Sequence, residues 1–364
     1  MTTQRPRVDY ENAEEQTMRP EVQRQPLLPI YEAVHNAIHA SQELELPHIV
    51  VDVEIHRAAD ALVDEVGRIE GFTVTDRGIG FTDGKTEAFF ELFTRNKKDT
   101  FNCKGMGRLA YFSSFVDVDV NSVFQENGEF RERNFSVTIA TIGTDALPKP
   151  EASTFSESKT VVKVHGLKPE CYKIYSIHSD SVVNSMRDYF AAAVLSLESL
   201  VLNIIDGDRT SVIDKKSYAS AKGSDITIDN ETFKTFHIKD MRTTKGSHEI
   251  HLTAAGRVVK KKSIQFLSGH KIGSKDEDRF YLKTIVISDF LDRVVNSTRS
   301  QFNGVAEKDE YANTISLEKI FANVSSEIRQ YIATIMPESM TANDEMIKLV
   351  VDELPHLAAV SDEQ

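Results

Sequence analysis

A carboxylate and a carboxamide stand four residues apart near the start of the chain. Glu32 and Asn36 follow Pro29 in a segment that has the periodicity of a helix. Residues four apart lie on one face of a helix, so both side chains would face the same ligand. A positioned carboxylate suits general-base work, and an amide oxygen suits a hard cation such as Mg²⁺. Taken alone, the pair is far more typical of two solvated polar residues on an amphipathic helix.

A turn that contains two glycines comes directly after a strand-like segment, residues 71–75. It runs Asp76-Arg-Gly78-Ile-Gly80-Phe81. Asp and Gly are common in the turns that end strands in any fold. The position directly after a strand and the Gly-x-Gly-Phe spacing make this turn more specific than the helical pair.

A second glycine segment precedes a helix-like stretch, residues 109–115. Its residues are Lys104, Gly105, Met106, Gly107 and Arg108. Gly105 and Gly107 would let backbone N–H groups approach phosphates, and the flanking Lys and Arg would add charge-assisted contacts. The segment lacks the Gly-Lys-Ser/Thr ending of a P-loop.

In this order the three segments resemble the nucleotide-binding signature of the GHKL ATPase superfamily, which includes DNA gyrase, Hsp90, histidine kinases and MutL. The resemblance covers residues 26–206. It implies that Glu32 activates the attacking water and that Asn36 holds Mg²⁺. Asp76 would accept a hydrogen bond from the adenine amine. Gly78 and Gly80 would shape the floor of the pocket, while Gly105 and Gly107 would leave room for the triphosphate.

Two further residues match the same signature in part. Lys97 lies in Thr94-Arg-Asn-Lys97, where the family keeps its ATP lid, and would bind phosphate. Thr160 opens a strand-like segment that resembles the family's third box, with Lys159 in place of the usual glycine, and its hydroxyl would contact adenine. A solvated lysine loop and an ordinary strand threonine are the alternatives. His39 stands where the family often has an aspartate.

The second half more weakly resembles the transducer domain of the gyrase, Hsp90 and MutL branch. Its cues are the turn at Gly256 and the apolar strand-like segment 281–288 that leads towards Arg299. In that branch a basic transducer residue reaches the γ-phosphate, and Arg299 or Lys260 would serve here. The basic run 257–262 could also contact nucleic acid, but a solvated strand end is favoured because the whole chain is acidic.

Composition narrows the class of protein. The 364 residues carry a net charge of −13, which argues against a broad nucleic-acid surface. The two cysteines, Cys103 and Cys171, form neither a disulfide framework nor a zinc spacing, which predicts a reducing cytoplasm. No apolar run is long enough to cross a bilayer, and the polar start is unlike a signal peptide.

Helix and strand patterns mix without strict alternation, which predicts an α+β protein. We expect a flexible N-terminal arm over residues 1–25. A Bergerat-type ATP-binding α/β sandwich, with a mixed sheet covered on one face by helices, would follow over residues 26–210. A transducer-like α/β domain with a helical C-terminal part would span residues 215–364. The cluster of Gly, Asp, Ser and Lys between residues 206 and 220 predicts the boundary.

The resemblance implies an ATP hydrolase that requires Mg²⁺ and forms a homodimer on binding ATP, so that it gates a protein partner or effector. Stand-alone bacterial proteins of this kind are often linked to anti-phage defence. The alternative is a non-hydrolysing ATP sensor subunit of a larger complex. A histidine kinase is disfavoured because only 31 residues precede Glu32. A topoisomerase fragment is disfavoured by the acidic charge and by the lack of a cleavage domain.

Overall fold

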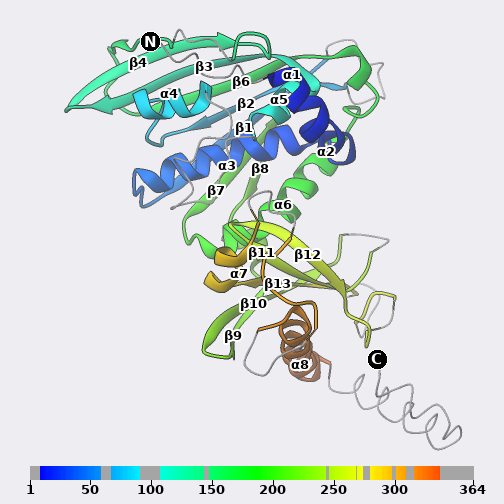
Figure 1. Cartoon of the computed structure of the whole chain (residues 1–364). Coiled ribbons are helices and arrows are strands. Elements are labelled where there is room, and N and C mark those ends of the chain that lie inside the picture. The colour runs from blue at the N-terminus through cyan, green and yellow to red at the C-terminus, as the bar shows by residue number, and fades with distance from the viewer. Residues whose placement is uncertain are drawn as a thin grey trace, which may run out of the picture. The chain divides into compact units, whose positions relative to one another are not determined.

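The computed structural model describes residues 9–58, 67–90, 107–142, 147–242, 246–267, 269–273, 279–296, 301–308 and 315–336. The chain divides into two compact units, Met1–Ala219 and Ser220–Gln364. Each unit combines a sheet with helices (Figure 1). The α+β fold class predicted from the sequence is therefore confirmed.

The first unit is built on an eight-stranded sheet in the order β5-β4-β3-β6-β2-β1-β7-β8. The pair β1–β7 is parallel and the other neighbours are antiparallel, so the sheet is mixed. The strands are β1 (Ile49–Arg57), β2 (Ile69–Asp76), β3 (Phe115–Glu126), β4 (Glu129–Val137), β5 (Glu151–Ala152), β6 (Lys159–Leu167), β7 (Leu200–Asp206) and β8 (Arg209–Ile213).

Helices cover one face of this sheet (Figure 1). They include α3 (Leu28–Glu43), α5 (Leu109–Ser114) and α6 (Ser179–Ser196). In α3, Ile30, Val34 and Ile38 recur at helical spacing and are buried. In β1, alternate residues from Ile49 to Ile55 are buried. This is the sandwich that the sequence predicts. The same unit also contains α4 (Asp83–Phe90) and the 3₁₀ helix η2 (Pro169–Cys171).

The N-terminal segment differs from the expected flexible arm, because residues 10–24 are helical. They form α1 (Tyr10–Ala13), the π-helix η1 (Glu14–Met18) and α2 (Arg19–Arg24). Val22 is buried, and the Tyr10 hydroxyl donates to the carbonyl of Phe90 at 2.8 Å. Glu14 is also buried and pairs with Arg19. The polar composition of this segment gives no sign of these long-range contacts. They stabilise a helical segment that lacks a clear periodicity of apolar residues.

The stretch expected to be a boundary also contains regular structure. Strand β8 pairs antiparallel with β7, and the 3₁₀ helix η3 (Lys215–Tyr218) follows it. The strand is short and of its residues only Ile213 is buried, so its sequence resembles a polar loop. The first unit therefore extends past residue 210 to Ala219.

The second unit has a five-stranded sheet in the order β12-β11-β13-β10-β9. Helix α8 packs on one face, since Ile320, Val324 and Ile328 are buried in one core cluster with Leu282 and Val286. The described elements are β9 (Lys222–Ile228), β10 (Glu231–Asp240), β11 (Glu249–Ala254), β12 (Arg257–Ser263), β13 (Tyr281–Ile287), α7 (Asp289–Val294) and α8 (Leu317–Ile335).

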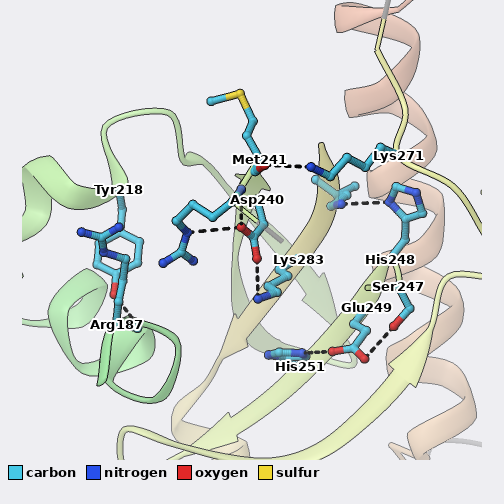
Figure 2. A network of polar contacts seen from close by, with 12 residues as sticks. Arg187, Tyr218, Asp240, Met241, Ser247, His248, Glu249, His251, Lys271 and Lys283 are labelled. Carbon is cyan, nitrogen blue, oxygen red and sulfur yellow. Dashed lines mark hydrogen bonds and ion pairs between the residues drawn. The ribbon is translucent and has the colours of Figure 1, made fainter. Parts of the chain in front are cut away.

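Several buried polar groups of the second unit, among them Asp240 and His248, have partners of opposite charge or matching hydrogen-bond type (Figure 2). Burial raises the pKa of Asp240, but Lys283 at 2.7 Å outweighs it and leaves that pKa below its ordinary value. The hydrogen bond from His251 lowers the pKa of Glu249 to about 2. His248 accepts from the N–H of Leu282 at Nδ1 and so donates through Nε2 to the carbonyl of His270. These contacts stabilise the pairing of the strands.

No helix in the described parts of either unit has the length and apolar character needed to span a bilayer.

Candidate functional site

Asp76 ends strand β2 with a carboxylate that is only 5% exposed. One of its oxygens accepts a hydrogen bond from the N–H of Gly78 at 2.7 Å. Burial raises the pKa of Asp76 to about 7, against the opposing effect of the Gly78 bond. By contrast, the pKa values of Asp206, Asp240, Glu249 and Glu327 are lowered by their partners. A desolvated group of this kind marks a candidate functional site.

Two hydroxyl groups extend this polar site across the sheet. Thr160 lies opposite Asp76 in the pairing of β2 with β6, and Ser122 lies opposite Thr160 in β3. Directly opposed residues point to the same face, and the two hydroxyl oxygens are 2.9 Å apart. Ser122 also accepts from the N–H of Phe81 at 2.9 Å. The sequence analysis did not single out Ser122, because the residue belongs to no motif and lies within the alternating strand-like segment 115–124.

The two glycines after Asp76 are required by close packing. A Cβ at Gly78 would lie 2.4 Å from the carbonyl carbon of Ala40 in α3. Gly80 has a φ of +70°, and a Cβ there would lie 2.8 Å from the Ser122 hydroxyl oxygen. Ile79 donates to the Ala40 carbonyl at 3.0 Å. The turn is therefore held between the C-terminal part of α3 and strand β3.

Arg133 of β4 stabilises this turn through its guanidinium group and is 1% exposed. Its guanidinium donates to the carbonyl of Phe81 at 2.6 Å and to the Thr86 hydroxyl, and it pairs with the Asp83 carboxylate. These bonds join the turn to the start of α4. A single arginine in a strand carries no sequence signal for such a role, and it was not predicted.

Glu32 lies against the second glycine segment. A Cβ at Gly107 would be 2.2 Å from Oε2 of Glu32 and 2.9 Å from its Cδ. Any side chain at position 107 would therefore displace the carboxylate. The structure brings together the first and third segments that the sequence singled out, although 75 residues separate Glu32 from Gly107.

Asn36 lies one turn further along α3, with an exposed side chain. Its Nδ2 donates to the hydroxyl of Tyr111 at 3.3 Å, so Oδ1 is the end of the amide that suits a cation. Together with the Glu32 carboxylate, this is an oxygen donor set of the kind that Mg²⁺ prefers. The described residues supply too few donors for a complete shell, so a nucleotide and water would have to supply others.

The histidines of α3 pack in the core of the first unit. His35 and His39 are buried, and the His35 ring packs against Tyr189 and Phe190. Across the described residues, no group of three or more His, Cys, Asp or Glu side chains is arranged to hold a metal ion.

Arg108 is engaged elsewhere in this structure. Its guanidinium donates to the carbonyl of Ala88 at 2.6 Å and lies 5.5 Å from the centre of the Phe89 ring, so its phosphate contact stays a prediction. In the second unit, Lys260 pairs with Glu307 at 2.5 Å. The other basic and glycine-segment candidates lie outside the described residues: Lys97, Lys104, Gly105, Met106 and Arg299.

No protein-family model matches the sequence, and no curated protein matches it. Solved structures do match. One is the crystal structure of the ATPase region of Saccharomyces cerevisiae topoisomerase II, with 14% sequence identity and a TM-score of 0.46, covering 84% of this chain and 85% of that one. A likeness this weak assigns no function to the chain, and the function proposed below is inferred from the site residues.

The raised pKa of Asp76 predicts a pH-dependent loss of stability in the ligand-free protein. The folded-state pKa of about 7 lies above the ordinary value of 3.8, so this group favours folding at low pH and loses that contribution as pH rises from about 4 to about 7. Asp76→Asn keeps the acceptor for Gly78 and removes the charge. The free energy of unfolding of the variant should therefore exceed that of the parent by an amount that grows between pH 5 and pH 8. Across the full titration of Asp76 this difference is at most about 4 kcal/mol.

Urea unfolding of the parent and the variant at both pH values measures this difference. Asp119→Asn is the matched control on the same sheet, because hydrogen bonds from Ser136 and His165 lower the pKa of Asp119 instead. That variant should show no such gain. A pH-independent difference for Asp76→Asn would contradict the assignment of a desolvated carboxylate.

Proposed function

We propose that this protein binds ATP and hydrolyses it with Mg²⁺. The observation that carries the proposal is that α3 connects two chemically different sites. Its Glu32 lies against Gly107, and its Ala40 holds the turn that follows the buried Asp76. Eight residues of helix rise about 12 Å, a span on the scale of a nucleoside triphosphate. A purine at Asp76 would thus leave its terminal phosphate near Glu32.

The purine end has the chemistry to select adenine. A buried carboxylate accepts a hydrogen bond from the exocyclic amine of adenine but opposes the carbonyl oxygen of guanine. Thr160, next to Asp76 on the same face, offers a hydroxyl to the same ring. Binding the adenine amine would give the desolvated Asp76 a second donor, which compensates part of the cost of its burial.

The phosphate end has the chemistry for hydrolysis. Asn36 would hold Mg²⁺, which when bound neutralises charge on the phosphates. Glu32 would orient the attacking water and take up its proton. Lys97, Lys104 and the backbone of Gly105, Met106 and Gly107 would contact phosphate, and Arg108 would do so if it left the Ala88 carbonyl.

Glu32→Ala tests hydrolysis directly. We expect ATP binding to remain close to that of the parent, because the purine site is untouched, while turnover falls by about 10²–10⁴-fold. Gly107→Ala should also lower turnover, since its new methyl group would displace the Glu32 carboxylate, and it should weaken ATP binding as well because Gly107 is a proposed phosphate contact. Phosphate release and calorimetric binding measure the two properties. Full turnover in Glu32→Ala would reject the base, and binding without turnover in the parent would favour the ATP sensor.

The purine preference gives an independent test. ATP should bind about tenfold or more tightly than GTP at pH 8, since an unpaired buried polar group costs about 1–3 kcal/mol. The Asp76 pKa of about 7 also predicts that ATP affinity falls as pH drops from 8 to 6, because the protonated acid must first lose its proton. Calorimetry with both nucleotides at both pH values measures this. Equal affinities at pH 8 would reject the role of Asp76.

We further propose that ATP drives formation of a homodimer that gates a protein partner. Residues 10–24 pack on the same chain here, where Tyr10 donates to Phe90 just before the predicted lid. Ordering of that lid by the triphosphate would change the contacts available to this segment. Arg299 of the second unit would supply a basic contact to the γ-phosphate.

Light scattering tests the dimer. The molecular mass should double with a non-hydrolysable ATP analogue and Mg²⁺. The protein should stay monomeric with ADP or without nucleotide. Tyr10→Phe removes the hydroxyl that contacts Phe90 and should shift the equilibrium towards the dimer, since it weakens the packing of the segment on its own chain. An unchanged mass under every condition would leave ATP binding intact and reject the nucleotide-driven dimer.

A further inference from the structure

We propose that Tyr111 is a positioning residue for the divalent cation, because its hydroxyl selects which end of the Asn36 amide faces the metal. The inference depends on the proposed ATP site and adds to it a residue that none of the sequence motifs contains. It assigns to Tyr111 no contact with nucleotide or metal.

The geometry begins with the place of Tyr111 in the fold. It lies on α5, four residues after Gly107, and is 2% exposed. Its ring packs edge-on against Phe72 of β2, with centroids 6.4 Å apart. The side chain is therefore held by the core of the first unit. Its hydroxyl meets the exposed Asn36 amide of α3 at 3.3 Å from Nδ2.

An amide needs such a partner if it is to bind a cation well. The oxygen and nitrogen ends of Asn36 have nearly the same shape, but only the oxygen can bind a metal ion. On an exposed helix surface, nothing in the side chain itself prefers one orientation. Once a cation takes Oδ1, the NH₂ group is the end that remains for the Tyr111 hydroxyl, which can accept its hydrogen bond. The hydroxyl therefore stabilises the productive orientation in the metal-bound state.

The size of the effect follows from one hydrogen bond. Loss of a hydrogen bond of this kind corresponds to about a threefold to tenfold change in an equilibrium constant. Tyr111→Phe removes the hydroxyl and keeps the ring that packs on Phe72. We expect the variant to fold and to bind ATP in EDTA as the parent does. The Mg²⁺ concentration that gives half of the metal-dependent gain in ATP affinity should rise about threefold to tenfold.

Calorimetric ATP titrations in EDTA and over a series of Mg²⁺ concentrations measure this, with Mn²⁺ paramagnetic resonance as a direct count of bound metal. Tyr175→Phe is the matched control: Tyr175 is also buried in the first unit, and its hydroxyl donates to the carbonyl of Pro26 at 2.7 Å. That variant should lose stability without changing the Mg²⁺ requirement. A general structural effect would move both variants alike.

A double-mutant cycle makes the test specific. Asn36→Asp places oxygen at both ends of the side chain, so its orientation ceases to matter to the cation. In that background, Tyr111→Phe should add no further change in the Mg²⁺ requirement. The effects of the two substitutions should therefore not be additive.

The inference is overturned if Tyr111→Phe leaves the Mg²⁺ requirement unchanged, if it weakens metal-free and metal-loaded ATP binding equally, or if its effect persists in Asn36→Asp. Failure of the parent protein to bind ATP in either condition would instead reject the proposed function, and this inference with it. ATP binding with a Mg²⁺ effect that is independent of Tyr111 would reject the inference alone.

Discussion

Helix α3 lies against two glycines so closely that a Cβ at either position would overlap it. Gly78 meets the backbone of Ala40, and Gly107 meets the carboxylate of Glu32. The first contact, between two backbones, sets the position of the helix relative to the end of β2, and the second sets the position of the Glu32 side chain relative to the start of α5. The orientation of Glu32 and Asn36 and the placement of the Asp76 turn all follow from them. A methyl group at either glycine would require the helix, or a side chain on it, to move.

A second constraint is that a buried carboxylate needs a partner to stabilise its charge. Asp206 pairs with Arg57 at 2.7 Å, Asp240 pairs with Lys283, and Glu327 lies 2.5 Å from His237. Each of these carboxylates has a lowered pKa because its partner outweighs desolvation. Asp76 has no such cation among the described residues and keeps a raised pKa. The fold thus carries a local cost that a hydrogen-bond donor on a ligand can offset.

The supporting residues of the site come from elements distant in sequence. Ser122 joins Thr160 to the turn at Phe81, Arg133 joins that turn to α4, and Tyr111 meets Asn36. None of the three belongs to a short motif, since each acts through a partner at least 38 residues away. Such residues are visible only once strand register and helix packing are known. These supporting residues determine how the donors and acceptors of the motif residues are oriented.

The sequence by itself determined the α+β class, the helix that carries Glu32 and Asn36, and the strand that ends at Asp76, because these depend on local periodicity and turn chemistry. It did not reveal that residues 10–24 are helical or that β8 extends the first sheet, since both are stabilised by contacts across the fold. Tertiary structure also decided that Gly107 accommodates Glu32 and that Arg108 binds the Ala88 carbonyl. The physical reason is that spacing specifies which face a side chain occupies, whereas its distance to a partner depends on how separate elements pack.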